Sequence, residues 1–269
     1  MAAERKVNTL KHLLAIELKK RLSIKVVMIS LAFIFLPLLV GLPLINGAYV
    51  FFRPMEVHSR LFETSAISLL FPALLVPLLA SSYAKEKKDH FLSYVQPRTD
   101  LSDYVVAKGL ASAIVAFVVA FLMIFIPFLF IQYVDPLFNM IQYTTEYFEL
   151  VRVGTFEFLA EKSFFLYGAV YSLWVAIHGA LYVTMGYLLS IYINNKFVAL
   201  SIPFLWWFVG HYVTGISGLE KFSPIYTVFP FGITPQPIWT VFVPFTALIL
   251  VIVILLTLIK TKQIVWADE

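Results

Sequence analysis

Six long runs of apolar residues dominate this sequence and limit the folds that it can adopt. A helix of about 20 mostly apolar residues crosses the roughly 30 Å hydrocarbon core of a bilayer. Because no water is available there, each crossing segment must pair its own backbone groups, and a helix does so. The residue alternation of a membrane β-barrel is absent. We therefore predict an all-α polytopic membrane protein with six transmembrane helices, at 26–45, 66–83, 109–133, 164–193, 197–215 and 238–259.

The composition agrees with a membrane protein and excludes several kinds of chemistry. Hydrophobic residues make up 61% of the chain and charged residues 13%, whereas a soluble domain has about 25% charged residues. The absence of cysteine excludes disulfides, thiolate metal sites and cysteine nucleophiles. No phosphate-binding loop of the Gly-x-x-x-x-Gly-Lys-Ser/Thr type is present, so the chain is not itself an ATPase of that kind. We expect it to bind no cofactor or metal.

The distribution of lysine and arginine predicts the orientation in the membrane. Fifteen of the 20 basic residues fall before the first span, in 85–108, beside the fifth span or after the sixth, and five fall in the opposite loops. The excess of positive charge on cytoplasmic loops then places both termini in the cytoplasm. Acidic residues divide equally between the two sides, so the net charge of +4 reflects topology. It gives no ground for nucleic-acid binding, and we expect a multi-pass protein of the cell membrane.

Residues 1–25 predict an amphipathic helix on the cytoplasmic side. Leucines recur at helical spacing, and basic side chains cover the remaining surface. Such a helix can lie along the membrane interface before the first span turns inward. The alternative is a basic flank that is merely helical. The leucines are Leu10, Leu13, Leu14, Leu18 and Leu22, and a short tail at 260–269 completes the cytoplasmic parts.

The segment 85–108 between the second and third spans is the most polar part of the chain. It holds nine of the 36 charged residues in only 24 positions. Phe91, Leu92 and Val95 can form one apolar face, with charged side chains at its rim. We interpret this segment as a docking helix; the alternative is an interfacial helix whose charges are solvated. The rim residues are Glu86, Lys87, Lys88 and Arg98.

The loop at 214–237 is apolar but too often interrupted by proline and glycine to span a membrane. It contains Ser223-Pro224 and Phe229-Pro230. Irregular backbone is tolerated at membrane depth only where protein or water covers it. This loop predicts a re-entrant or interface-lying hairpin on the outer side, before the sixth span. An ordinary ordered loop is the alternative.

Small residues form a stripe along the fourth span. Such a stripe lets a second helix approach closely, either within the chain, which we favour, or in a dimer. His178 lies mid-span without an acidic neighbour in sequence, so we interpret it as a structural residue rather than as a proton relay. The glutamates of the outer loop 135–162 are interpreted as a solvated face. The stripe is Gly168, Ser172, Ala176, Ala180 and Thr184, and the glutamates are Glu146, Glu149, Glu157 and Glu161.

The order Glu86, Leu92, Pro97-Arg98, Tyr104 and Lys108 resembles the signature that follows the second span in permease subunits of type-2 ABC exporters. Pro97-Arg98-Thr99 replaces the commoner Pro-x-Arg order, and the usual glycine-threonine after the glutamate is missing. The amphipathic N-terminal helix, the six spans and the Ser-Pro hairpin extend the resemblance to nearly the whole chain. The implied coupling residues are Glu86, Lys88, Phe91, Leu92, Val95, Pro97, Arg98 and Lys108.

The resemblance implies a half-size permease that forms a homodimer or a related heterodimer and binds two copies of a separate cytoplasmic ATPase. ATP and Mg²⁺ would be bound by that partner, so this chain would not be an enzyme. The second and fifth spans would line the path, and the hairpin (Ser223, Pro224, Phe229 and Pro230) would form an outer gate. Candidate path residues are Phe71, Phe204, Trp207, Phe208 and His211.

An aromatic path favours an amphipathic peptide, a drug or a lipid-like molecule as the cargo. Two other classes of function remain open at this point. A membrane-embedded enzyme would need polar groups that converge at membrane depth. An immunity or binding protein would sequester a toxin without using ATP.

Overall fold

The computed structural model describes residues 2–97, 99–144 and 154–262. Within these ranges the chain is helical, and its one β-type contact is an isolated bridge between Phe51 and Tyr143. The predicted all-α class is confirmed. Arg98, Glu146 and Glu149, which the sequence singles out, lie outside the described residues.

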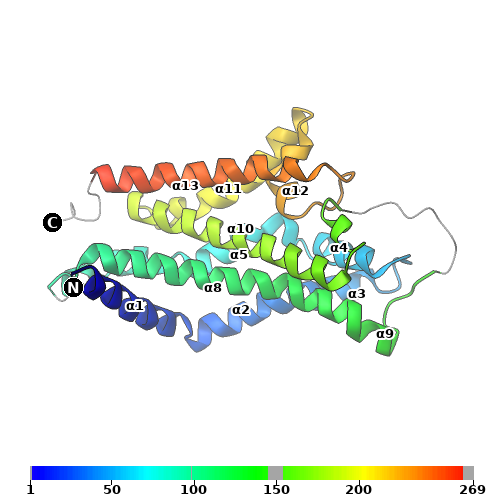
Figure 1. The fold of residues 1–269 in the computed structure, drawn as a ribbon, viewed down its shortest axis with the longest axis horizontal. Helices are drawn as coiled ribbons and strands as arrows, with labels where there is room; N and C mark the ends of the chain where they lie inside the picture. Colours follow the sequence, from blue (N-terminus) through cyan, green and yellow to red (C-terminus); the bar gives the residue numbers. More distant parts are fainter. Residues whose placement is uncertain (1, 98, 145–153, 263–269) are drawn as a thin grey trace.

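The helices form an elongated bundle (Figure 1). In chain order they are α1 (Ala2–Arg21), α2 (Ile24–Leu36), the π-helical η1 (Pro37–Gly41), α3 (Leu42–Ile45), α4 (Pro54–Thr64), α5 (Ile67–Leu79), α6 (Ser82–Lys88), α7 (Leu92–Val95), α8 (Leu101–Leu129), the π-helical η2 (Phe130–Val134), α9 (Asp135–Phe138), the 3₁₀ turn η3 (Glu157–Leu159), α10 (Phe164–Tyr192), α11 (Lys196–Ile216), the 3₁₀ turn η4 (Glu220–Phe222), α12 (Pro224–Val228), the 3₁₀ turn η5 (Ile238–Val241) and α13 (Phe242–Lys262).

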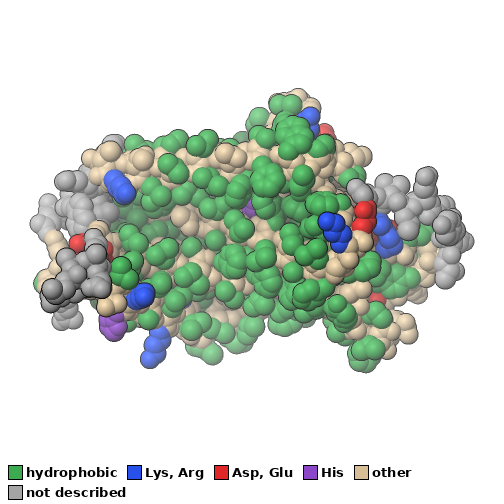
Figure 2. All heavy atoms as spheres, viewed as in Figure 1, with side chains coloured by type: hydrophobic (Ala, Val, Ile, Leu, Met, Phe, Trp, Pro, Cys, Tyr) green, Lys and Arg blue, Asp and Glu red, His purple; other side chains and the backbone are tan. Residues whose placement is uncertain are grey.

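Five helical stretches are long and apolar enough to cross a membrane. They are Ile24–Ile45, Leu101–Phe138, Phe164–Tyr192, Lys196–Ile216 and Ile238–Thr261. Figure 2 shows hydrophobic side chains over the middle of the bundle and charged side chains mainly toward its two ends. This pattern is typical of a membrane protein.

The second predicted span differs from the structure. The sequence predicts a single helix over 66–83, but α5 has 13 residues and ends at Leu79. At 1.5 Å per residue it is about 20 Å long, too short to cross a bilayer alone. It follows α4 after a bend of 59°, and Ala66 at the bend has a positive φ of 55°. Only the bent pair α4–α5 can count as a sixth candidate span.

The long helices α8 and α10 pack against each other at the centre of the bundle. A Cβ atom on Gly168 would lie 2.3 Å from the Phe128 ring of α8, and one on Gly179 would lie 2.8 Å from Ala120. Ser172 and Ala176 are fully buried. Small residues on this face of α10 therefore serve helix packing within the chain, as favoured from the sequence.

The two ends of the bundle differ in what they contain. One end carries α1, α6, α7 and the last turns of α13, and we refer to it as the α1 end. The opposite end carries α4, α9 and α12, and we refer to it as the α12 end. The predicted apolar hairpin folds back at the α12 end, where Phe229 and Phe231 lie in the hydrophobic core.

One glutamate of the predicted solvated acidic face is buried instead. Glu157 is 5% exposed and accepts a hydrogen bond from the guanidinium of Arg53, which follows α3. Its second oxygen accepts from the backbone N–H of Gly154 at 3.4 Å. A buried carboxylate requires such partners. The expectation of a solvated face is therefore wrong for this residue.

Candidate functional site

A buried cluster of charges lies at the α1 end, where three helices meet. Lys108 of α8 is 1% exposed. Its ammonium donates to Glu17 of α1 at 2.9 Å, to Glu86 of α6 at 2.7 Å and to the Tyr104 hydroxyl at 3.1 Å. That hydroxyl donates in turn to the other oxygen of Glu86 at 2.9 Å. Every ammonium hydrogen has a partner, which is the condition for burying such a charge.

Arg21, at the end of α1, extends the same cluster. Its guanidinium donates to the backbone carbonyl of Leu79 and to the hydroxyls of Ser82 and Ser112. The Leu79 carbonyl belongs to the last turn of α5, which lacks an intrahelical donor. Arg21 thus ties α1 to the junction of α5 and α6 and to α8.

We name these residues the buried ion network: Glu17, Arg21, Ser82, Glu86, Tyr104, Lys108 and Ser112. Burial by itself raises the pKa of the Glu17 carboxyl, but the ammonium groups of Lys20 and Lys108 outweigh it and lower that pKa below its ordinary value. Lys20 Nζ lies 2.6 Å from Glu17. Glu17 is therefore a carboxylate at neutral pH, and its charge balances that of Lys108.

The segment between α5 and α8 turns outward from this network. His90, with a φ of 53°, breaks the chain direction between α6 and α7. After it, the Phe91 side chain is 41% exposed and the Tyr94 side chain 71% exposed. Lys20 Nζ lies 5.9 Å from the centre of the Phe91 ring. The segment therefore presents two aromatic side chains away from the bundle.

The predicted apolar face of this segment is arranged differently from the expectation. Leu92 and Val95 are half-buried and pack against the core, whereas Phe91 is exposed. One turn of α7 cannot point all three residues in one direction while anchoring the segment to the bundle. Leu92 and Val95 act as anchors, and Phe91 and Tyr94 form the outward face.

The other residues predicted for this segment are scattered. Lys88 and Pro97 are exposed and make no contact with the buried ion network. Arg98 lies outside the described residues. Of the eight predicted coupling residues, the structure brings Glu86 and Lys108 into direct contact.

Glu17 and Arg21 complete the network, and the sequence interpretation missed them because it treated the N-terminal helix only as an amphipathic surface. A signal was present. Glu17 is the one acidic residue among the basic residues of 11–25, and Arg21 lies four positions later on the same helix face. Lys108 and Ser112 repeat that spacing on α8, and the Ser112 hydroxyl donates to the Lys108 carbonyl at 2.8 Å.

Three of the predicted path and gate residues meet inside the bundle. The Phe71 ring lies 5.8 Å from the Trp207 ring and 5.4 Å from the Phe229 ring, measured between ring centres. The indole N–H of Trp207 points at the carbonyls of Ser68 and Leu69, at 3.1 and 3.0 Å. These aromatics fill the space between α5, α11 and the hairpin, and in this conformation they are packing residues.

The remaining path and gate residues lie at the edge of that cluster or outside it. Phe204 and Phe208 stack on each other at 5.8 Å, and Phe208 is 41% exposed. His211 Nδ1 lies 2.7 Å from the hydroxyl of Ser223, and this hydroxyl also caps α12. Pro224 and Pro230 are buried with the hairpin.

His178 lies in the aromatic interior, as a structural histidine should. Its ring packs 4.6 Å from the Trp174 ring and 5.2 Å from the Phe245 ring. Nδ1 lies 2.9 Å from the carbonyl of Trp174, while Nε2 makes no hydrogen bond to the described residues. This environment contains no carboxylate among the described residues that could take a proton from it.

Comparison of the chain with protein families, with curated proteins and with solved structures finds no match.

Proposed function

We propose that the chain is the permease subunit of a type-2 ABC exporter. A separate cytoplasmic ATPase docks on the outward face of the α6–α7 segment, and ATP and Mg²⁺ are bound by that partner. One observation carries the proposal. The segment that exposes Phe91 and Tyr94 is joined through Glu86 and Lys108 to three other helices, so a force applied to it reaches the bundle.

The buried ion network supports this transmission because its members act as a unit. Glu86 belongs to α6, Lys108 to α8 and Glu17 to α1. Separating any pair would leave a buried charge without a partner, which is strongly unfavourable. A shift of α6 therefore displaces α1 and α8 together. Since α8 continues to the α12 end, the movement reaches the opposite side of the membrane.

The outward face has the chemistry of a protein interface. Aromatic side chains are enriched where partners meet, and Phe91 and Tyr94 both project from a short segment. Lys88 and Asp89 are exposed beside them and supply charges that orient a partner. Nucleotide binding shifts the permease only if it favours one arrangement of the segment over another.

In this proposal two permease copies meet in the cell membrane, with both termini in the cytoplasm. The outer face of α11, with Phe204, Phe208 and Tyr212, and the exposed Leu69 and Leu70 of α5 face the path between the copies. Their apolar and aromatic character suits an amphipathic peptide, a drug or a lipid-like cargo.

The docking step is tested with Tyr94→Asp, because Tyr94 is exposed and its loss does not open the core. The chain is purified from native membranes in mild detergent, and the ATPase activity that accompanies it is measured per mole of chain. We expect Tyr94→Asp to lose most of this activity and Tyr94→Phe to keep it.

Leu22→Asp is the matched control, since it places the same charge on an exposed apolar residue (66% exposed) at the same end of the bundle. The control should retain the accompanying activity. Equal activity in Tyr94→Asp and in the unchanged chain would refute docking on this face.

A further inference from the structure

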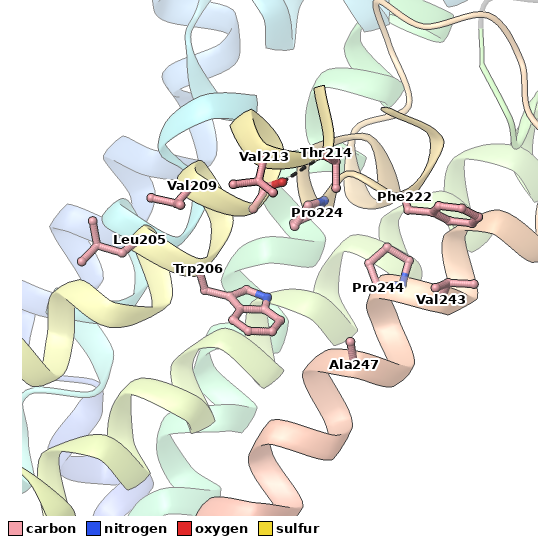
Figure 3. Close-up of a pocket in the computed structure, with 11 residues that line it drawn as sticks. Leu205, Trp206, Val209, Val213, Thr214, Phe222, Pro224, Val243, Pro244 and Ala247 are labelled. Atoms are coloured by element: carbon pink, nitrogen blue, oxygen red, sulfur yellow. Dashed lines mark hydrogen bonds between the residues drawn. The ribbon is translucent and has the colours of Figure 1, made fainter. Parts of the chain in front are cut away.

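A groove of about 550 Å³ opens between α11, α12 and α13 (Figure 3). Leu205 and Val209 of α11 form one wall, Val243 and Ala247 of α13 form the other, and Pro224 of α12 lies between them. Its size falls within the roughly 300–1,000 Å³ typical of ligand sites.

The lining offers a ligand almost only carbon. Thr214 is the polar exception, and its hydroxyl donates to the carbonyl of Gly210 at 2.9 Å or to that of His211 at 2.9 Å. The groove therefore selects a hydrocarbon chain rather than a polar solute.

The position of the groove indicates where the hydrocarbon comes from. Its walls belong to Lys196–Ile216 and Ile238–Thr261, which are both long and apolar enough to cross a membrane. The end of α11 and the turn η4 project from the side of the bundle (Figure 1), so the groove opens sideways, where a bilayer would surround a spanning helix. It also lies on a different face of α11 from Phe204 and Phe208, which stack together away from it.

A positive charge stands at one end of the groove. Lys221 Nζ lies 5.3 Å from the centre of the Phe222 ring and 6.0 Å from that of Trp239, and Phe222 itself lines the groove. Its exposed neighbour Glu220 carries the opposite charge. A zwitterionic headgroup, with one phosphate and one amine, complements this pair.

We propose that this groove binds one phospholipid of the surrounding bilayer. One acyl chain lies between α11 and α13, and the headgroup phosphate lies at Lys221. Aromatic rings at the level of the headgroups and a lysine that reaches toward them are the usual anchors at a membrane interface. This site does not depend on the proposed export function.

The groove is tested by filling it. The full chain in mild detergent is titrated with dioleoylphosphatidylethanolamine, and bound lipid is counted by native mass spectrometry. We expect one retained lipid per chain, and at least tenfold weaker binding in Ala247→Phe, whose ring occupies the groove. Leu250→Phe is the control, because Leu250 lies on the same helix, is 56% exposed and does not line the groove.

The headgroup contact is tested separately. Lys221→Gln should weaken binding of the phospholipid several-fold but leave binding of dioleoylglycerol, which has the same chains and no phosphate, unchanged. Lys162→Gln, an exposed lysine at the α12 end, should change neither.

Unchanged phospholipid binding in Ala247→Phe would overturn the proposal. A change of oligomeric state in Ala247→Phe without a change in lipid binding would also overturn it, because a second copy of the chain would then occupy the groove. Equal losses of phospholipid and dioleoylglycerol in Lys221→Gln would overturn the assignment of the phosphate to Lys221.

Discussion

Lys108 and Glu17 are 91 residues apart in the chain, yet their side chains form an ion pair of 2.9 Å. Both are almost fully buried, at 1% and 2% exposed. The same ammonium reaches Glu86 at 2.7 Å. One buried lysine therefore joins the N-terminal helix, the segment after α5 and the start of α8, and several predictions depend on it.

Replacing Lys108 by methionine should destabilise the protein strongly. The substitution keeps much of the side-chain volume but leaves two carboxylates facing each other without a cation, and breaking a buried pair costs about 3–5 kcal/mol. Lys88→Met, at an exposed position of the same segment, should change the free energy of unfolding by less than about 0.5 kcal/mol. Denaturant unfolding in mixed micelles measures both. Similar small losses in the two variants would show that the pair contributes little.

The network should also make stability depend on acid pH through Glu17. The pKa of this carboxyl is lower in the folded protein than its ordinary value of 4.5. Its stabilisation is therefore complete above about pH 4.5 and is lost as the pH falls through the folded pKa. Glu17→Gln should flatten the loss of stability below pH 4.5, measured by thermal unfolding across a pH series. Asp89→Asn, an exposed control, should follow the unchanged chain, and an identical slope in Glu17→Gln would contradict the expectation.

The contact between α8 and α10 should not tolerate one added methyl group at Gly168. A Cβ there would lie 2.3 Å from the Phe128 ring, and overpacking of this kind costs about 1–3 kcal/mol. Gly215→Ala adds the same methyl in α11, where nothing lies within 4 Å, and it should be neutral or stabilising by up to about 1 kcal/mol. The free energies of unfolding of both variants test this. A neutral Gly168→Ala would mean that α8 and α10 are farther apart than described.

Single cysteines can test the proposed orientation, because the chain contains none of its own. Tyr94→Cys at the α1 end should react with a membrane-impermeant maleimide only when the cytoplasmic side is opened. Leu219→Cys at the α12 end, where Leu219 is 47% exposed, should react in intact cells. The opposite pattern would invert the proposed topology.

The helical class and five of the six apolar stretches follow from hydropathy because lipid requires long runs of apolar residues. The second span could not be predicted in this way. Its true partner, α4, carries Glu56, His58, Arg60 and Glu63, so no apolar window includes it. The bend at Ala66 adds a left-handed residue that no local pattern marks.

The site was predicted in part for a similar reason. Glu86 and Lys108 lie in one polar segment and were identified together. Glu17 and Arg21 reach them only because α1 packs along α8, and such a long-range contact leaves no periodic pattern in the sequence. The inward turn of Leu92 and Val95 likewise depends on His90 and its positive φ.

The most direct test of the account is a photocrosslink from the outward face of the α6–α7 segment. A benzophenone maleimide is attached to Tyr94→Cys in native membranes, and after illumination the adduct is identified by mass spectrometry. The account predicts a crosslink to an ABC ATPase subunit that is much weaker from Leu22→Cys at the same end of the bundle. An adduct to lipid alone, or equal adducts from both positions, would contradict docking of an ATPase on this segment.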